Sequence, residues 1–390
     1  MILRVLCVSA LWYWLCLGAD SIHAGHGAPT ASGVHSLDVF TDGRALHLLV
    51  AEYSSGTNPP ALLYQRSADA GRTWSKPVRV DTGAKPPRSP SRGMDAQIAA
   101  VGKNLIALWG THGEGYMGSG PMVTALSDDG GKTWRPGPNP ADDGLNTGHA
   151  YADLASDSQG ALHLVWLDSR DGKQGLRYAR STDGGRTWSK NLTLKKETCE
   201  CCWNTLAVSG NTVHVLFRDK SPRDMAMVSS FDGGLTWGKP AVAGGFGWEF
   251  QGCPHVGGGL ALPLSGEGSL HALVWTGLAE KSGVYHLRST NRGTTWQPPQ
   301  RIGPVDARRS DIAVRDRALV AALEIVADGE SAVFAAKSVD GGVTWSAPQR
   351  LSASGVSASY PRVIAVRGGF RVFWTEAAPQ GVGKWNSARF

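Results

Sequence analysis

One eight-residue pattern, Ser-x-Asp-x-Gly-x-Thr-Trp, occurs six times along this chain and constrains its fold more than any other feature. The copies follow one another at intervals of 49 to 60 residues, and a repeat of that period is typical of arrays of similar structural units. They are SADAGRTW (67–74), SDDGGKTW (127–134), STDGGRTW (181–188), SFDGGLTW (230–237), STNRGTTW (289–296) and SVDGGVTW (338–345). The fifth copy has Asn291 in place of the Asp.

Each copy has the chemistry of a hairpin turn between two strands. Asp hydrogen-bonds its own backbone two residues on, and Gly adopts a positive φ without steric cost. The Thr and Trp that follow favour the pleated surface of a strand. Two further strand-like runs precede each hairpin, such as YADLASDS and ALHLVWLD in the third unit. Four strands per repeat with Gly-rich turns predict an all-β fold, a β-propeller of four-stranded blades.

The number of blades depends on the C-terminal region. After the sixth copy, three more strand-like runs remain, which are SYPRVIAV, FRVFWTEA and KWNSARF. Three strands lack a fourth, and residues just after the N-terminus could supply it by closing the ring. This arrangement favours seven blades, with six as the alternative.

The repeated pattern resembles the Asp-box, or bacterial neuraminidase repeat, which sialidases share with many sialidase-like propellers. The resemblance extends from about residue 34 to residue 390. It implies that the six hairpins are structural turns, and on its own it would suggest six blades.

The N-terminal segment has the pattern of an export signal. The basic start MILR is followed by the apolar run VLCVSALWYWLCLGA and then by small residues, with Ala24 as the last residue before cleavage. The sequence therefore predicts a signal peptide at 1–24, a single propeller domain at 25–390, and a periplasmic or secreted protein. An uncleaved anchor is the alternative; after cleavage no membrane segment is expected.

The net charge of +6 permits attraction to acidic glycans. No basic run or aromatic ladder indicates nucleic acid as a partner.

Propeller geometry predicts where a ligand would bind. The Asp-box turns lie on one face, so the loops that lead into each innermost strand lie on the opposite face, as do those joining the second and third strands. These loops converge on the mouth of the central channel, where ligand sites of such folds gather. They are rich in ionisable and aromatic residues, and we expect a glycan, a peptide or another small ligand to bind there.

Four cysteines remain after the signal peptide. Cys199, Cys201 and Cys202 lie in the loop TCECCWN, and Cys253 occupies the matching position of the next blade, in FQGCPHV. An oxidising compartment favours disulfides, with Cys253 bridged to one of the other three. The second interpretation is a copper or zinc site completed by His255, because thiolates select soft ions. A redox-active pair is the third.

The sialidase resemblance also implies a catalytic set. Retaining sialidases use a Tyr nucleophile polarised by a Glu, an Asp acid/base and three Arg residues that clamp the substrate carboxylate. Loop positions nominate Tyr360 with Glu324, Asp95 as the acid, and Arg309 and Arg362 together with Arg218 or Arg223 as the clamp. The chain departs from the family because the first blade, SLDVFTDGRALHLLVAEY, has no Arg-Ile-Pro motif. Tyr360 is alternatively a rim aromatic, and Glu324 with Arg309 a rim ion pair.

Three functions follow from these observations. The leading hypothesis is an exported propeller that binds a ligand at the channel mouth beside the cysteines. The second is a glycoside hydrolase of the exo-sialidase type. The third is a platform for protein–protein assembly. The sequence leaves open whether the protein is an enzyme.

Overall fold

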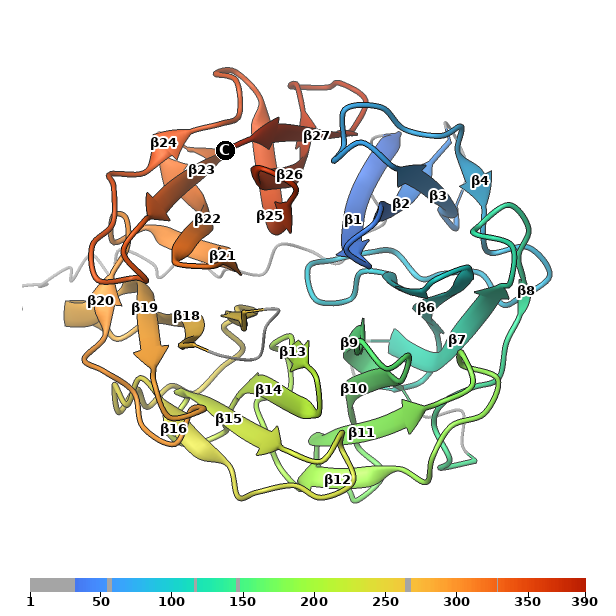
Figure 1. Ribbon diagram of the computed structural model, residues 1–390, viewed down its shortest axis with the longest axis horizontal. Coiled ribbons are helices and arrows are strands. Elements are labelled where there is room, and N and C mark those ends of the chain that lie inside the picture. Colours follow the sequence, from blue (N-terminus) through green and yellow to red (C-terminus); the bar gives the residue numbers. More distant parts are fainter. Residues whose placement is uncertain (1–31, 55–57, 116–117, 145–147, 264–267, 328) are drawn as a thin grey trace, which may run out of the picture. The chain divides into compact units, whose positions relative to one another are not determined.

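Seven antiparallel sheets form the ring of a β-propeller in the computed structural model (Figure 1). The structure describes residues 32–390 except 55–57, 116–117, 145–147, 264–267 and 328. Residues Ala31–Phe390 make up one compact unit. The predicted signal peptide lies outside the described residues. Within the described part of the chain, no helix is long and apolar enough to cross a membrane.

Each blade runs outward from an innermost strand to an edge strand, in sequence order. Blade 1 contains β1 (Gly33–Thr41), β2 (Leu46–Tyr53), β3 (Ala61–Ser67) and β4 (Val78–Arg79). Blade 2 contains β5 (Gln97–Val101), β6 (Asn104–His112), β7 (Ser119–Ser127) and β8 (Arg135–Pro136). Blade 3 contains β9 (Ala150–Ser156), β10 (Leu162–Asp168), β11 (Gly175–Ser181) and β12 (Leu192–Lys195). Blade 4 contains β13 (Thr205–Ser209), β14 (Thr212–Arg218), β15 (Met225–Ser230) and β16 (Ala241–Ala243).

The remaining blades repeat this order. Blade 5 contains β17 (Gly259–Ala261), β18 (Leu270–Thr276), β19 (Gly283–Ser289) and β20 (Gln300–Arg301), with a single 3-10 turn, η2 (Ala279–Lys281), between β18 and β19. Blade 6 contains β21 (Ala307–Arg315), β22 (Ala318–Ala327), β23 (Glu330–Ser338) and β24 (Gln349–Arg350). Blade 7 contains β25 (Ser357–Val366), β26 (Gly369–Ala377) and β27 (Lys384–Arg389). The predicted seven-bladed, all-β propeller is confirmed.

The ring closes differently from the sequence expectation of a fourth strand donated by the N-terminus. Residues 33–41 pair with β2 as the innermost strand of blade 1. Their backbone link to blade 7 is a parallel bridge between Gly33 and Gly383, in which the Val34 N–H donates to the Gly383 carbonyl at 2.8 Å and the Gly383 N–H donates to the Ser32 carbonyl at 2.9 Å. Arg371 of β26 adds a second closure, because its Nε donates to the Ala70 carbonyl at 2.8 Å. The N-terminal strand belongs to its own blade, so a short stretch of backbone pairing and side-chain contacts together complete the ring.

The Asp-boxes are hydrogen-bonded turns between the third and fourth strands. In the third box, Asp183 Oδ1 accepts from Ser181 Oγ at 2.8 Å and from the Thr187 backbone at 2.9 Å, and Oδ2 accepts from Thr187 Oγ1 at 2.6 Å. The other four boxes with Asp repeat these bonds. Asn291 preserves the set by donating through Nδ2 to Thr295 Oγ1 at 2.9 Å. The structural role that the resemblance implied is therefore visible in every copy.

Each box also packs against the preceding blade. A Cβ on Gly131 would lie 2.0 Å from Tyr64 Cε1, and one on Gly234 would lie 1.8 Å from the Tyr178 hydroxyl. Glycine is required at these positions because the neighbouring ring occupies the space of a side chain. The boxes therefore join successive blades on the face opposite the channel mouth.

A row of buried histidines lies beneath these turns. They start the second strands of four blades and contact a polar group on the third strand of the same blade; they are His47, His163, His214 and His271. Burial lowers the pKa of His47 and His214 to about 4 and of His271 to about 3. The imidazoles of His47, His214 and His271 are therefore neutral structural groups at physiological pH.

Candidate functional site

Three of the residues nominated for catalysis meet between blades 6 and 7. Glu324 of β22 is almost fully buried, and its carboxylate accepts from Arg309 Nη1 at 2.5 Å and from the Tyr360 backbone N–H at 3.0 Å. The Arg309 guanidinium lies 5.2 Å from the centre of the Tyr360 ring. The structure thus brings Tyr360, Glu324 and Arg309 together, with the carboxylate bonded to the tyrosine backbone.

Tyr360 has an unusual backbone that fixes the position of its ring. Its φ is +59°, in the left-handed region, and it lies where the pairing of β25 with β26 slips between Ser359 and Arg362. A large residue adopts this conformation only where the surroundings enforce it. Burial raises the pKa of the Tyr360 hydroxyl, while Arg309 and a hydrogen bond from the Arg92 backbone oppose that shift.

The loop that leads into β5 supplies a further cation and the predicted acid. Arg92 Nη1 lies 3.9 Å from Asp95 Oδ2, and the Arg92 guanidinium lies 5.1 Å from the ring centre of Trp203. Burial lowers the pKa of Arg92 to about 10, and repulsion by Arg362 adds to this effect. Burial also raises the pKa of Asp95. Both side chains are less than a tenth exposed.

Arg362 lies among carboxylates from several blades. Its Nη2 is 3.4 Å from Asp38 Oδ1. The negative charges of Asp38, Asp311, Asp153 and Asp95 outweigh the effect of burial and raise the pKa of Arg362. The charge of Arg362 is therefore balanced by the protein.

Three of these aspartates also hold neighbouring blades together, because each accepts from a backbone N–H of the next innermost strand. The pairs are Asp38 with Ile98, Asp153 with Leu206 and Asp311 with Val363. Burial raises the pKa of Asp153 to about 7.

The third cation of this site is Arg92, which was not among the nominated clamp residues. Arg218 and Arg223, which were nominated as alternatives for the third clamp residue, form hydrogen bonds elsewhere. Arg218 donates to the carbonyls of Val256, Arg223 and Trp275, and Arg223 donates to the Phe250 carbonyl and to Glu200. Arg92 precedes a short strand and shows no repeat-specific pattern, so only its position in space identifies it.

Several buried polar atoms around Tyr360 have no hydrogen-bond partner among the described residues. They are Arg92 Nε and Nη1, Arg309 Nε, Arg362 Nε, Asp95 Oδ1 and Gln97 Oε1. Most buried polar atoms in native proteins are paired, so such a group requires an explanation. We call Tyr360, Arg92, Arg309, Arg362 and Asp95 the Tyr360 cluster.

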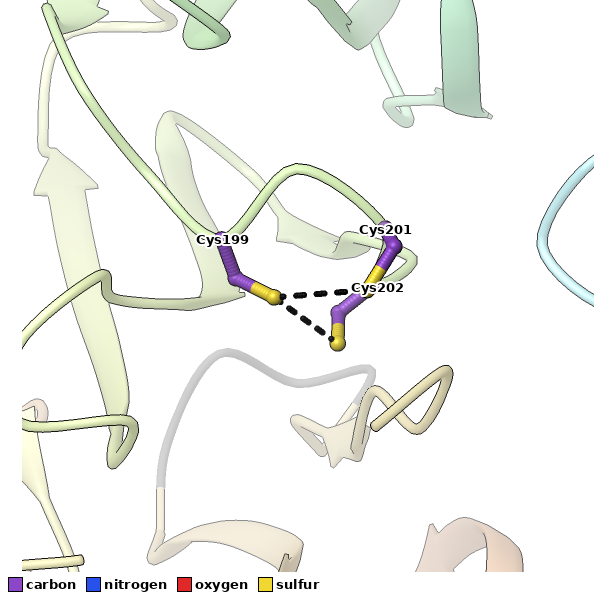
Figure 2. Close-up of side chains that lie close together, drawn as sticks. All are labelled: Cys199, Cys201 and Cys202. Carbon is purple, nitrogen blue, oxygen red and sulfur yellow. Dashed lines mark hydrogen bonds between the residues drawn. The ribbon is translucent and has the colours of Figure 1, made fainter. Parts of the chain in front are cut away.

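The cysteines form a second cluster at the same face. Figure 2 shows Cys199, Cys201 and Cys202 on the loop between β12 and β13, with their sulfur atoms directed toward one another. Cys199 Sγ lies 3.2 Å from Cys202 Sγ and 3.7 Å from Cys201 Sγ. The ligand atoms of Cys201, Cys253 and His255 also lie within 4.8 Å of one another. All five residues expected to hold a metal are thus brought together, with Cys201 common to both groups.

The thiols differ in their environments. Hydrogen bonds with Cys201 and Cys202 hold the pKa of Cys199 well below its usual range. The bond to Cys199 raises the pKa of Cys201, and burial raises the pKa of Cys202. No disulfide joins the cysteines of the described residues, so the disulfide interpretation stays a prediction.

The two clusters are linked through Trp203, the residue after Cys202. Its ring stacks with the Arg92 guanidinium, and a Cβ on Gly93 would lie only 2.6 Å from Trp203 Cβ. Trp203 Nε1 donates to the Gly258 carbonyl of blade 5 at 3.2 Å. The cysteine loop and the Tyr360 cluster are therefore parts of one packed region.

Comparison with known proteins agrees with this architecture. The family described as BNR/Asp-box repeat matches residues 125–136 and 179–190, which contain the second and third boxes. This chain is an Asp-box β-propeller. A sialidase from Bacteroides fragilis is 26% identical over 196 residues, which cover 45% of this chain. The match spans only 33% of that sialidase.

Solved structures resemble the Asp-box propeller over most of its length. An ulvan lyase, a polysaccharide lyase, superposes with a TM-score of 0.63 at 12% identity, covering 91% of this chain and 94% of the lyase. A protein of unknown function from Dyadobacter fermentans gives a TM-score of 0.51 at 13% identity, covering 78% of this chain and 94% of its own. At these identities the likeness concerns the fold alone.

Proposed function

We propose that this Asp-box propeller binds an acidic glycan at the mouth of its channel, in the Tyr360 cluster. The observation that carries the proposal is a set of buried guanidinium nitrogens in Arg92, Arg309 and Arg362 that have no hydrogen-bond partner among the residues that the structure describes. Guanidinium groups bind carboxylates and sulfates through paired, charge-assisted hydrogen bonds, and these bonds would satisfy the unpaired donors.

The cations differ in how strongly the protein already neutralises them. Arg309 is paired with Glu324, and Arg362 is surrounded by aspartates. Among the described residues, the carboxylate nearest to Arg92 is Asp95 at 3.9 Å, the guanidinium lies over the Trp203 ring, and two of its nitrogens have no hydrogen-bond partner. We therefore assign Arg92 as the main anion-binding group, with the Tyr360 ring as an aromatic surface for the sugar.

The relatives support an acidic ligand. One is a sialidase, and the ulvan lyase has been solved bound to a -[GlcA(1-4)Rha3S]- unit, which carries a uronic acid and a sulfate. Both proteins handle negatively charged sugars, which matches a site lined with arginines.

The test is calorimetric titration with acidic oligosaccharides and with neutral oligosaccharides of the same length. Arg92→Met should weaken binding of the acidic ligands at least tenfold, because about 1.5–3 kcal/mol is lost with a charged hydrogen bond. The matched control is Arg186→Met, which removes the same charge from an exposed residue on the Asp-box face. Equal weakening by both variants, or equal affinity for neutral and acidic sugars, would contradict the proposal.

Hydrolysis by Tyr360 is the second candidate, favoured by the strained backbone that holds its ring beside Arg309. The raised pKa of its hydroxyl means that a base must remove the proton before attack. Glu324 contacts the backbone of Tyr360, so its carboxylate would need to turn toward the hydroxyl. Asp95 would protonate the leaving group.

Tyr360→Phe should abolish release of an aryl leaving group from a sialoside while leaving glycan affinity within a few fold. Turnover by this variant would remove Tyr360 as the nucleophile.

A further inference from the structure

We infer that Cys199, Cys201, Cys202, Cys253 and His255 form a binding site for one soft metal ion, Cu(I) or Zn(II). None of its ligands belongs to the Tyr360 cluster, so metal binding is measured separately from glycan binding. Thiolate and imidazole are the ligands that these ions prefer. Cys201 is the central ligand because its sulfur lies within 4.8 Å of the sulfur atoms of Cys199 and Cys202 and also within 4.8 Å of the ligand atoms of Cys253 and His255.

The sulfur spacing matches a coordination sphere. Four ligands about 2.3 Å from one ion at tetrahedral angles lie about 3.8 Å apart. The distance of 3.7 Å between Cys199 Sγ and Cys201 Sγ agrees with this value, and the 3.2 Å between Cys199 and Cys202 requires an opening of about half an ångström. Small side-chain rotations would therefore suffice for Cys199, Cys201 and Cys202 to hold the ion, with Cys253 or His255 as the fourth ligand.

Buried positive charge surrounds the thiols and complements a negatively charged metal–thiolate centre. Arg218 is 1% exposed, and the described residues form no ion pair with it; its guanidinium donates to three backbone carbonyls. Arg223 is also buried and shares Glu200 with Lys220. An unpaired buried guanidinium is costly, and thiolates beside Arg218 would offset that cost.

The backbone holds the two ligand segments against each other. The Cys199 N–H donates to the Arg218 carbonyl at 3.0 Å, and Arg218 Nε donates to the Val256 carbonyl at 2.9 Å. Arg218 therefore connects the Cys199 loop directly to the segment that carries Cys253 and His255. His255 has a φ of +52°, a strained conformation that fixes the direction of its imidazole.

The experiment uses the mature, reduced protein under anaerobic conditions. It is titrated with Cu(I), and separately with Zn(II), against a chelator of known affinity for each ion. We expect one ion per chain, and X-ray absorption should show sulfur neighbours at about 2.3 Å. The arm with the tighter binding identifies the metal.

Cys201→Ser should weaken binding at least a hundredfold, whereas His112→Gln, an exposed imidazole at the same face, should leave it unchanged. Cys253→Ser, at a half-buried position, serves as a second ligand variant if Cys201→Ser fails to fold. Equal metal affinity in wild type and a folded ligand variant would overturn the inference. A second result would also overturn it: in the protein as purified, the thiols react with a thiol reagent only after a disulfide has been reduced.

Discussion

Asp183 in the third Asp-box provides a sharp test of what these turns contribute. Replacing it by Ala removes three hydrogen bonds, from Ser181 Oγ, the Thr187 backbone and Thr187 Oγ1. Each such bond contributes about 1 kcal/mol net, and the box is partly exposed, so the expected loss is about 2–3 kcal/mol. Unfolding of about 360 residues carries an entropy of about 0.75 kcal/mol/K, so the melting temperature should fall by about 3–4 °C.

The chain itself contains the matched control for this change. Asn291 occupies the same position in the fifth box and makes all three contacts, with its amide donating to Thr295 Oγ1. Asp183→Asn should therefore cost less than about 1 kcal/mol, because it exchanges one bond for another of similar strength. Calorimetry and urea denaturation at neutral pH measure both variants.

Two results would refute this reasoning. If Asp183→Asn destabilises the fold as much as Asp183→Ala, the negative charge and not the bonding geometry stabilises the turn. If Asp183→Ala leaves the melting temperature unchanged but eliminates glycan binding, the boxes are functional groups. The first result would also make the natural Asn291 a weak point in the ring.

Two further predictions concern packing and pH. Gly131→Ala should destabilise the fold by several kcal/mol, since its Cβ would lie 2.0 Å from Tyr64 Cε1. The control is Gly130→Ala, whose Cβ meets nothing within 4 Å, and it should cost about 1 kcal/mol for its positive φ. Equal costs of the two variants in urea denaturation would contradict the packing argument. His214→Val removes a group whose pKa burial lowers from 6.5 to about 4, so its contribution is complete above pH 6.5 and is lost as the pH falls toward 4. The stability of wild type relative to this variant should fall by about 2 kcal/mol between pH 7 and pH 5, and a constant difference would show that the imidazole is not held neutral.

The sequence predicts the fold well because its information is local. Each Asp-box sets its own turn through residues at most four positions apart, so the pattern is readable without knowledge of the neighbours. The seven-bladed count followed from three surplus strands. The contact of Arg371 with the Ala70 carbonyl was not predicted, because these residues lie 301 positions apart in the chain and no local pattern marks such a contact.

The candidate site was only partly predictable, because charge balance depends on which charged side chains become neighbours in the folded structure. Loop position placed Tyr360, Glu324 and Arg309 together. It could not show that Arg362 is neutralised by aspartates that join the blades, or that Arg92 keeps unpaired nitrogens. The aspartates that accept from the next blade recur in three innermost strands, and that recurrence is a sequence signal that could have been read.

Backbone strain is distributed in a way that separates structure from function. In the Asp-boxes, Ala70 and Arg292 adopt positive φ where the other copies have Gly, so the turn geometry itself explains these two. Tyr151, His255 and Tyr360 adopt it at the lead-in to an innermost strand, where no turn motif requires it. Each of these conformations costs on the order of 1–3 kcal/mol and persists only where the surrounding contacts enforce it. Three strained residues thus lie on the face with the glycan and metal candidates without a turn motif to explain them, whereas the boxes on the other side contribute stability between the blades.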